Sequence, residues 1–288
     1  MKKITLGIDQ VLDTLRVMLP DIAKRLIISR DDISDSVKKT FSDNCDNAFE
    51  HSPLWHQYGI LTHSIEFQKI VVFEVPTLMK RWGIFDVTKS RLSEKIDGIS
   101  KADLLQIASL LHDLGKFTTR TYDRLDDGTL RVNFDGHEAD SGRIVRHELK
   151  NMLLELGLTM EQIEYIAVCA EHHFDLGRAR KIAIDNGGYT IEYARSGIFR
   201  DVARNIISSN PDFSLEIGLM FIADSLSKTE IMAVADNDAD ILGQKPVLEQ
   251  KIEAEALDPR LINQALQQPV NVEIGRQYLQ VWADLQIV

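Results

Sequence analysis

The residues of this chain that can do chemistry are histidines and aspartates set in or beside apolar segments. The clearest group is His112-Asp113, which follows an apolar stretch and is itself followed by Gly115-Lys116. A neutral imidazole and a carboxylate side by side can ligate one divalent cation, and a nearby lysine can pair with a phosphate as a point charge. We therefore expect His112 and Asp113 to bind a metal ion, Asp113 and Lys116 to act in catalysis, and Lys116 to bind substrate.

Two further groups, one on each side of this pair in the sequence, are candidate ligands for the same ion. His63 precedes the pair, and Asp224 follows it within an otherwise apolar run that ends near Leu226. Burying such groups without compensation is costly, and a shared cation satisfies several of them at once. An ion pair with Lys228, four residues later, is the alternative for Asp224.

Three of the four histidines between Asp113 and Asp224 are further candidates. His137 precedes a predicted helix, and His172 and His173 end another one. Adjacent helical positions point roughly 100° apart, so one of this pair can face the site while the other is solvated or supports the first. His173 is in phase with the apolar residues of its helix, but both remain candidate metal ligands.

Other polar residues give weaker signals. Arg143 lies shortly after His137 and is a candidate for binding a substrate phosphate, with a solvated helix face as the alternative. His51, His56 and His147 are not assigned to the site, and a loop histidine is the favoured interpretation of His56.

The elements that must position these groups are almost all helical, because apolar residues recur at steps of three and four along the chain. Predicted helices include one near the N-terminus that Pro20 can break, one from near Thr62, and one with an apolar stripe over 104–111 that Gly115 caps. Others are expected over 138–156, closed by Gly157, and over 247–268 and 272–283. The exception is 120–134, where Asp127-Gly128 between two alternating runs predicts a small β-hairpin. The sequence thus predicts an all-α fold with one hairpin.

Composition limits the classes of function. The chain has 288 residues and a net charge of −11, which argues against an extended nucleic-acid surface but not against a small phosphorylated substrate. Its two cysteines form no CxxC pair, which fits a reducing compartment. No apolar run is long enough for a membrane span and the N-terminus lacks a signal-peptide pattern, so we expect a cytoplasmic protein.

The order His63, His112-Asp113, Asp224 on predicted helices resembles the HD-domain superfamily of metal-dependent phosphohydrolases. The resemblance extends from about His51 to Ile231 and implies an HD-domain helical bundle over 51–232, with an N-terminal helical extension over 1–50 and a C-terminal helical tail over 233–288. It also implies that His63, His112, Asp113 and Asp224 bind the first metal, and members with two metals add histidines between the HD pair and the last aspartate. The extension and the tail either cover the core or form a homo-oligomer interface.

The stretch from His112 to Val145 also resembles the HD domain of bacterial tRNA nucleotidyltransferases, which hydrolyses phosphomonoesters and 2′,3′-cyclic phosphates. This resemblance is local and carries no expectation for tRNA processing. It implies a small phosphorylated substrate, of which a nucleotide is the favoured type.

The implied cofactor is one or two divalent ions, with Mn, Fe, Ni, Co, Zn and Mg all left open. Such ions lower the pKa of bound water towards ~7, so that it can attack phosphorus. Alternatives are a diiron oxygenase of the same fold and a metal-binding or nucleotide-binding sensor without turnover. A cyclic-dinucleotide phosphodiesterase is disfavoured because no Gly-Tyr-Pro follows His172-His173. A guanosine tetraphosphate hydrolase is disfavoured because the Glu-Asp pair of that branch is missing.

Overall fold

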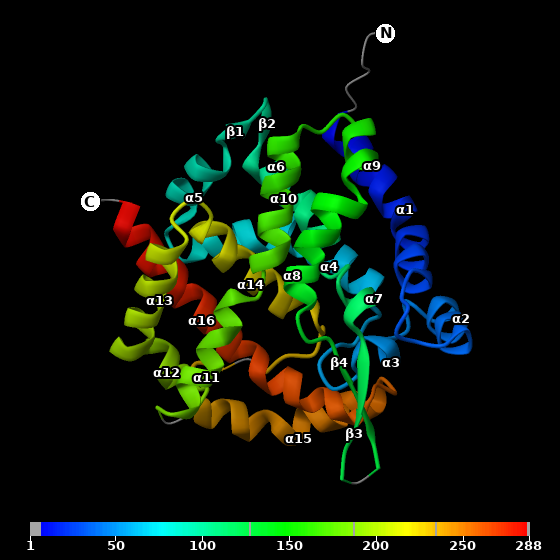
Figure 1. Cartoon of the computed structure of the whole chain (residues 1–288). Coiled ribbons are helices and arrows are strands. Elements are labelled where there is room, and N and C mark those ends of the chain that lie inside the picture. The colour runs from blue at the N-terminus through cyan, green and yellow to red at the C-terminus, as the bar shows by residue number, and fades with distance from the viewer. Residues whose placement is uncertain (1–6, 127, 187, 234, 287–288) are drawn as a thin grey trace. The chain divides into compact units, whose positions relative to one another are not determined.

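The computed structural model describes residues 7–126, 128–186, 188–233 and 235–286, and the regular secondary structure of these residues is mostly helical (Figure 1). The predicted all-α class is therefore confirmed. The chain divides into two compact units. The first takes in Met1–Ser52, Tyr58–Gln68 and Ser93–His172, and the second takes in Pro53–Gln57, Lys69–Leu92 and His173–Val288. The predicted boundaries at 51 and 232 are a different division and stay a prediction.

The first unit is built around two buried helices, α6 and α10, with α8 packed on α10 and α1 packed on α6. Apolar side chains of α6 are almost completely buried, as the stripe over 104–111 predicted. The helices of this unit are α1 (Ile8–Ile28), α2 (Asp35–Asp43), α3 (Ala48–His51), the start of α4 (Ile60–Arg81), α6 (Lys101–Leu111), α7 (Lys116–Thr119), α8 (His137–Arg143), α9 (Lys150–Glu155) and α10 (Met160–His172).

Two antiparallel strand pairs also belong to the first unit. The predicted hairpin is confirmed as β3 (Thr121–Arg124) and β4 (Leu130–Asn133), with Tyr122 opposite Val132, although Asp127 lies outside the described residues. A second hairpin, β1 (Lys95–Ile96) and β2 (Ile99–Ser100), was not predicted. The turn of this hairpin is Asp97-Gly98, and both residues have positive φ. It therefore uses the same Asp-Gly turn as the predicted hairpin, but its strands are much shorter.

Two predictions about helices in the first unit need correction, and a third is confirmed. Helix α1 runs without interruption through Pro20, so the break that the proline allowed does not occur. The single helix expected over 138–156 is instead α8, a π-helical turn over Ile144–Glu148, and α9. Gly157 ends this segment with φ +96°, a left-handed conformation that glycine adopts without steric cost, as predicted.

In the second unit, the long helix α16 contacts α5, α12, α13, α14 and α15. Gly218 of α14 and Gly275 of α16 permit close packing, since a Cβ at Gly275 would lie 2.2 Å from Ile222. The elements are the end of α4, α5 (Phe85–Leu92), a 3-10 turn (Asp175–Arg178), α11 (Ala179–Ile184), α12 (Ile191–Arg195), α13 (Gly197–Ser209), α14 (Ser214–Ser227), α15 (Asp238–Ala254), a 3-10 turn (Pro259–Leu261) and α16 (Ile262–Gln286).

The C-terminal helices expected over 247–268 and 272–283 have other boundaries. The break falls at 255–261 because Ala256 has positive φ and Asp258 caps a turn that begins with Pro259. Pro269 lies inside α16 and does not end it. None of the helices in the described ranges combines the length and the apolar character that crossing a bilayer requires.

Candidate metal centre

The buried carboxylate of Asp113 lies at the centre of a cluster of histidines in the first unit. Asp113 lies two residues after the end of α6, and this helix is capped at its start by Ser100, whose side chain accepts the N–H of Asp103. The apolar residues of α6 bury this helix, and His112 and Asp113 at its end are therefore buried with it, at 0% and 1% exposure. A carboxylate in such surroundings requires positive charge or hydrogen-bond donors nearby.

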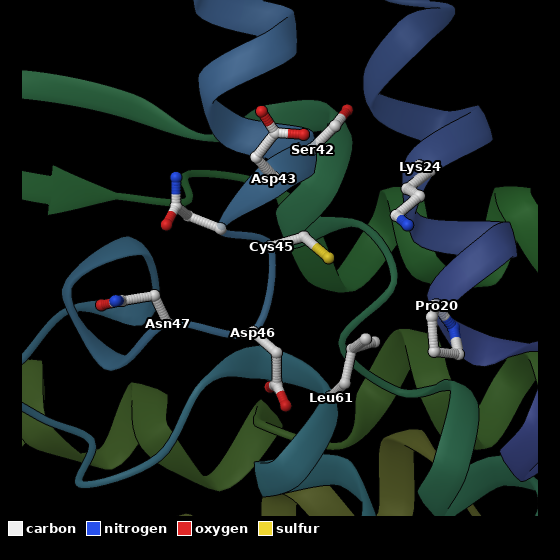
Figure 2. A pocket seen from close by; sticks show the side chains of 9 residues that line it. Pro20, Lys24, Ser42, Asp43, Cys45, Asp46, Asn47 and Leu61 are labelled. Atoms are coloured by element: carbon white, nitrogen blue, oxygen red, sulfur yellow. The ribbon is translucent and has the colours of Figure 1, made fainter.

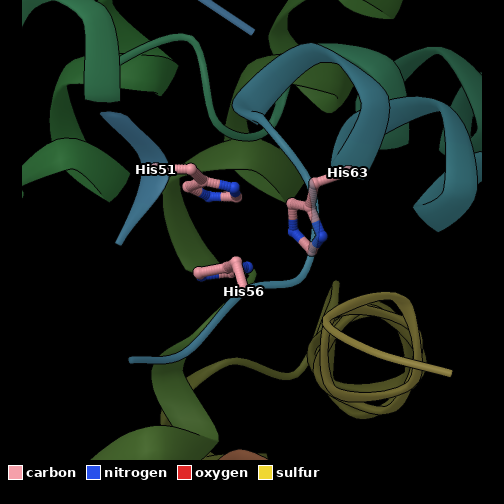
Figure 3. A group of neighbouring side chains, drawn as sticks. All are labelled: His51, His56 and His63. Carbon is pink, nitrogen blue, oxygen red and sulfur yellow. The ribbon is translucent and has the colours of Figure 1, made fainter. Parts of the chain in front are cut away.

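Four imidazoles direct their Nε2 atoms at this carboxylate. The distances to Asp113 Oδ2 are 3.3 Å from His112, 3.4 Å from His63 and 3.7 Å from His51, and His137 Nε2 lies 3.4 Å from Oδ1. Figure 3 shows His51 and His63 with their rings turned toward each other, and their ring centroids are 5.1 Å apart. Residues from α3, α4, the end of α6 and the start of α8 thus meet at one aspartate.

The tautomers of three of these histidines follow from their hydrogen bonds to backbone carbonyls. Nδ1 of His51 lies 2.9 Å from the Tyr58 carbonyl, Nδ1 of His112 lies 2.7 Å from that of Ser109, and Nδ1 of His137 lies 2.8 Å from that of Phe134. A carbonyl oxygen only accepts, so Nδ1 carries the proton in each ring. In the neutral imidazole, Nε2 then presents a lone pair to the cluster, which is the arrangement that metal-binding histidines need.

Lys116 is the cation that the chain itself supplies to this cluster. Its Nζ donates to Asp113 Oδ2 at 2.6 Å and contacts His51 Nε2 at 2.9 Å. Burial alone would raise the pKa of Asp113, but His112 and Lys116 outweigh it and hold this pKa well below its usual range. Burial, and then the charge of Lys116, hold the pKa of His51 well below its usual value. Asp113 is therefore ionised and His51 neutral near pH 7.

The donor set fits a divalent transition metal. Imidazole nitrogen and carboxylate oxygen are ligands that bind such ions at about 2.1 Å, so two ligands of one ion lie roughly 3–4 Å apart. The four Nε2–Asp113 distances fall in that interval. Ligand atoms of His51 and His63, and of His63 and His112, are also within 4.8 Å of each other. His51, His63, His112, Asp113 and His137 can therefore hold a metal.

Comparison with known families agrees with this geometry. The profile of the HD domain matches residues 89–229, which contain the His112-Asp113 pair, His137 and Asp224. Residues 89–229 form an HD domain. The resemblance to the HD-domain superfamily is therefore confirmed, and this superfamily consists largely of metal-dependent phosphohydrolases. No curated protein matches the chain. The match starts after His51 and His63, so both of these ligand candidates lie outside it.

Gly115 of the HD domain serves a purpose other than the predicted helix cap. Its φ of −61° is an ordinary helical value, and α6 has already ended at Leu111. A Cβ at this position would lie 2.1 Å from the backbone oxygen of His137 and 2.8 Å from the backbone nitrogen of Ser141. The Gly115 N–H also donates to Ser141 Oγ at 2.9 Å. Glycine is thus required because α7 and α8 approach closely, which brings Lys116 and His137 to the same carboxylate.

Two predicted ligands of the HD domain lie in the second unit. Asp224 is buried in α14, and its carboxylate forms an ion pair with Lys228 at 2.7 Å, the alternative partner that the sequence suggested. Lys228 Nζ also lies 4.8 Å from the ring centroid of Phe174. His173 is 2% exposed, in agreement with its helical phase, whereas His172, the last residue of the first unit, is partly exposed.

The predicted substrate ligand Arg143 lies on the surface of α8. Its guanidinium pairs with Asp140 at 2.5 Å and with Glu148 at 3.1 Å, and its side chain is 45% exposed. These partners raise its pKa, the hydrogen bond to Asp140 most of all. Its role toward a substrate stays a prediction.

The sequence did not assign His51 to the site, although the structure places it beside Asp113. His51 ends the short helix α3, which Asn47 caps by accepting the N–H of Phe49. Asp46, which lies just before α3, helps to position His63. Its carboxylate accepts hydrogen bonds from the backbone N–H and from the hydroxyl of the neighbouring Thr62. The only available signal for His51 was its position at the start of the region that resembled the family.

A separate pocket of about 560 Å³ lies in the first unit (Figure 2). Its lining is mixed, with Lys24 of α1, the apolar Leu61 of α4 and polar residues between α2 and α3. Cys45 lines it with a thiol whose pKa is raised, chiefly by burial. None of the lining residues is among the predicted site residues, so this pocket is distinct from the centre at Asp113.

Proposed function

We propose that this protein is a metal-dependent phosphohydrolase that cleaves a phosphomonoester or phosphodiester of the nucleotide or 2′,3′-cyclic phosphate type. The observation that carries the proposal is the convergence of four imidazole Nε2 atoms on the Asp113 carboxylate, within an HD-domain chain. A divalent cation bound between them would favour this arrangement of imidazole nitrogens around a carboxylate at 3.3–3.7 Å.

The residues that would hold the ion are His63, His112, Asp113 and His137. The H…HD…D order of the family adds Asp224, and the sequence pattern adds His173 with His172 as its neighbour. A bound divalent ion supplies an activated water and polarises phosphoryl oxygens. The protein's own contribution is a buried, preorganised set of ligands, with the Lys116 ammonium available to balance negative charge on the phosphoryl group. Arg143 is a second candidate for contact with the substrate.

The substrate is expected to be small. A net charge of −11 disfavours a long nucleic-acid contact, because that affinity comes mainly from neutralised phosphates. A single phosphate group can be neutralised by the ions and Lys116 alone. This favours nucleotides, nucleoside cyclic phosphates and small phosphomonoesters as the substrate class.

The test of this proposal measures metal content and phosphate release on the same purified sample. Elemental mass spectrometry on the purified full chain should give one or two divalent ions per chain. Phosphate release from an aryl phosphate and from 2′,3′-cyclic nucleotides should increase on addition of Mn²⁺ or Ni²⁺. Asp113→Asn should lose both the ions and the turnover, whereas His147→Gln, which changes an exposed histidine, should keep both.

The charge change in Asp113→Asn leaves Lys116 buried without its counter-ion, so the variant needs a folded control. The double variant Asp113→Asn with Lys116→Met removes both charges, and its helical circular dichroism should match that of the wild type. Bound metal without release from any substrate would instead favour the sensor function, and bound iron with oxygen uptake would favour the oxygenase. Full turnover in Asp113→Asn would overturn the site.

A further inference from the structure

The geometry points to His51 as an additional metal ligand on the Oδ2 side of Asp113, and to Lys116 as an ammonium that competes with the ion for these two acceptors. The inference rests on the proposed function in one respect, namely that the site binds a divalent ion. It adds a ligand that lies outside the matched HD domain and a role for Lys116 in metal affinity.

His51 is built as a ligand would be. Its side chain is completely buried, and its Nδ1–H is fixed by the Tyr58 carbonyl at 2.9 Å. Its Nε2 lone pair therefore points to the side of Asp113 from which His63 and His112 also approach. The distance of 3.7 Å between His51 Nε2 and Asp113 Oδ2 is what two ligands of one ion at about 2.1 Å give.

Lys116 contacts the same two atoms. Its Nζ lies 2.6 Å from Asp113 Oδ2 and 2.9 Å from His51 Nε2, so the ammonium bridges the acceptors that an ion would bridge. An ion ligated by both atoms and the ammonium cannot share this position, because their charges repel at such short distances. Metal binding on this side of Asp113 therefore requires Lys116 to move.

The ammonium of Lys116, although buried, can leave Asp113 by rotation of the lysine side chain. It is the first residue of α7, its four-carbon side chain is flexible, and its Nζ lies 5.5 Å from the ring centroid of Phe134. Once released from Asp113, the ammonium can pair with a substrate phosphate. The competition thus links the two roles of Lys116, because the lysine becomes available to substrate when the ion takes its carboxylate.

The test measures Mn²⁺ binding to the full chain by isothermal titration calorimetry, without any substrate. Lys116→Met should bind Mn²⁺ at least about tenfold more tightly than the wild type, since a competing charge is gone. His51→Gln should bind at least about 10–100-fold more weakly, because the loss of a ligand costs no less than the loss of a group that only supports one. The matched controls are Lys39→Met, a surface lysine paired with Asp43, and His147→Gln, and both should match the wild type.

The double variant His51→Gln with Lys116→Met separates a ligand from a structural residue. If His51 and Lys116 act on one ion, the removal of Lys116 should strengthen binding much less in this background than in the wild type. Wild-type affinity in His51→Gln, or weaker binding in Lys116→Met, would overturn the inference while leaving the phosphohydrolase intact. A wild-type chain that binds no Mn²⁺ would overturn both, and circular dichroism on each variant identifies loss of folding.

Discussion

At the scale of single residues, the site is organised by backbone carbonyls that orient histidine rings. His51, His112 and His137 each give Nδ1–H to a carbonyl, at Tyr58, Ser109 and Phe134. For His112 and His137 the acceptor lies three residues earlier in the chain, so the local turn fixes the ring before any distant contact forms. Such orientation fixes which nitrogen faces Asp113 and would reduce the entropy lost if an ion binds there.

Gly115→Ala tests how closely α7 and α8 must approach. The new Cβ would meet the backbone oxygen of His137 and the backbone nitrogen of Ser141, neither of which can rotate away. We expect a loss of about 1–3 kcal/mol in the free energy of unfolding, typical of overpacking. We also expect weaker metal binding, because Lys116 and His137 would move apart. Urea unfolding and metal content are the measurements.

The matched control for this substitution is Gly243→Ala in α15. No atom lies within 4 Å of a Cβ there, and the position is inside a helix. Alanine should therefore raise the free energy of unfolding by roughly 0.5–1 kcal/mol. If both substitutions changed the free energy of unfolding equally, the lack of space for a Cβ would not be the reason that glycine is required at position 115.

The sequence singled out several of the residues that the structure brings together at Asp113, and their role as a site stays a prediction. The His112-Asp113 pair with Lys116 stood out because an apolar stripe ended in polar groups of ligand type. His137 was added by the resemblance to HD proteins with two metals. His51 was not predictable, because the carbonyl that orients its ring and the lysine that contacts it come together only in three dimensions. The predicted role of Gly115 was wrong because a requirement for close approach has no local sequence signature.

At the scale of elements, a buried ionic cluster joins α3 to the hairpin next to the site. Glu50, adjacent to His51, forms an ion pair with Arg120, which follows α7, and accepts the Tyr122 hydroxyl at 2.6 Å. The Arg120 guanidinium lies 3.5 Å from the Phe41 ring centroid, and burial lowers its pKa to about 10. The cluster therefore fixes the two segments that carry His51 and Lys116.

Glu50→Gln should be strongly destabilising. It leaves the buried guanidinium of Arg120 without its counter-charge, which costs about 3–5 kcal/mol when a buried pair is broken on one side. The double variant Glu50→Gln with Arg120→Met removes both charges and should recover a large part of that loss. Chemical denaturation of the four proteins of this cycle gives the coupling energy. A coupling below about 0.5 kcal/mol would mean that the pair does not hold these elements together.

A second ionic cluster, on α12 and α16, should make the free energy of unfolding depend on pH. Glu273 accepts from Arg195 at 2.8 Å and from Arg276 at 2.6 Å. Burial would raise its pKa, but these arginines lower it to about 2 from 4.5. A depressed pKa in the folded state adds stability that is present above the unfolded value of 4.5 and is lost as the pH falls toward 2.

Glu273→Gln should therefore lower the free energy of unfolding at pH 7 by roughly 1–3 kcal/mol and flatten its decline between pH 4.5 and pH 2. Denaturant titrations of wild type and variant at several pH values measure both effects. Glu249→Gln, on the exposed side of α15, is the control and should change little. If the free energy of unfolding fell with pH in the same way for wild type and Glu273→Gln, Glu273 would not be the source of the pH dependence.

Element types were more predictable than element boundaries. Helical spacing predicted the helices that carry His63 and Asp224 and the helix that ends just before His112, and Asp-Gly predicted the hairpin. The boundaries expected over 138–156 and 247–268 were wrong for different reasons. Across the π-helical turn the buried Val145, Leu149 and Leu153 still recur at steps of four, so periodicity does not reveal the turn. Proline inside a helix is tolerated at Pro20 and Pro269 but coincides with a break at Pro259, where Ala256 and Asp258 also leave helical geometry.

At the scale of the whole molecule, the acidic balance affects how metal binding must be measured. A net charge of −11 attracts divalent cations to the surface in a diffuse way. At about 0.15 M salt this attraction is screened beyond roughly 8 Å in solvent. The candidate ligands around Asp113 are buried, so their interaction with an ion would be screened far less. Binding that persists at this ionic strength therefore reports the buried centre.

Removal of metal should lower the thermal stability of the protein. An ion that binds only the folded chain adds about 2.7 kcal/mol at one hundred times its Kd. For a domain of this size each kcal/mol moves Tm by roughly 2–4 °C, so Mn²⁺ should raise Tm by several degrees over chelated protein. The same addition to His112→Asn should raise Tm far less, because a ligand is lost while the surface charge is unchanged. An equal rise in both proteins at 0.15 M salt would place the stabilising ions on the acidic surface instead of at Asp113.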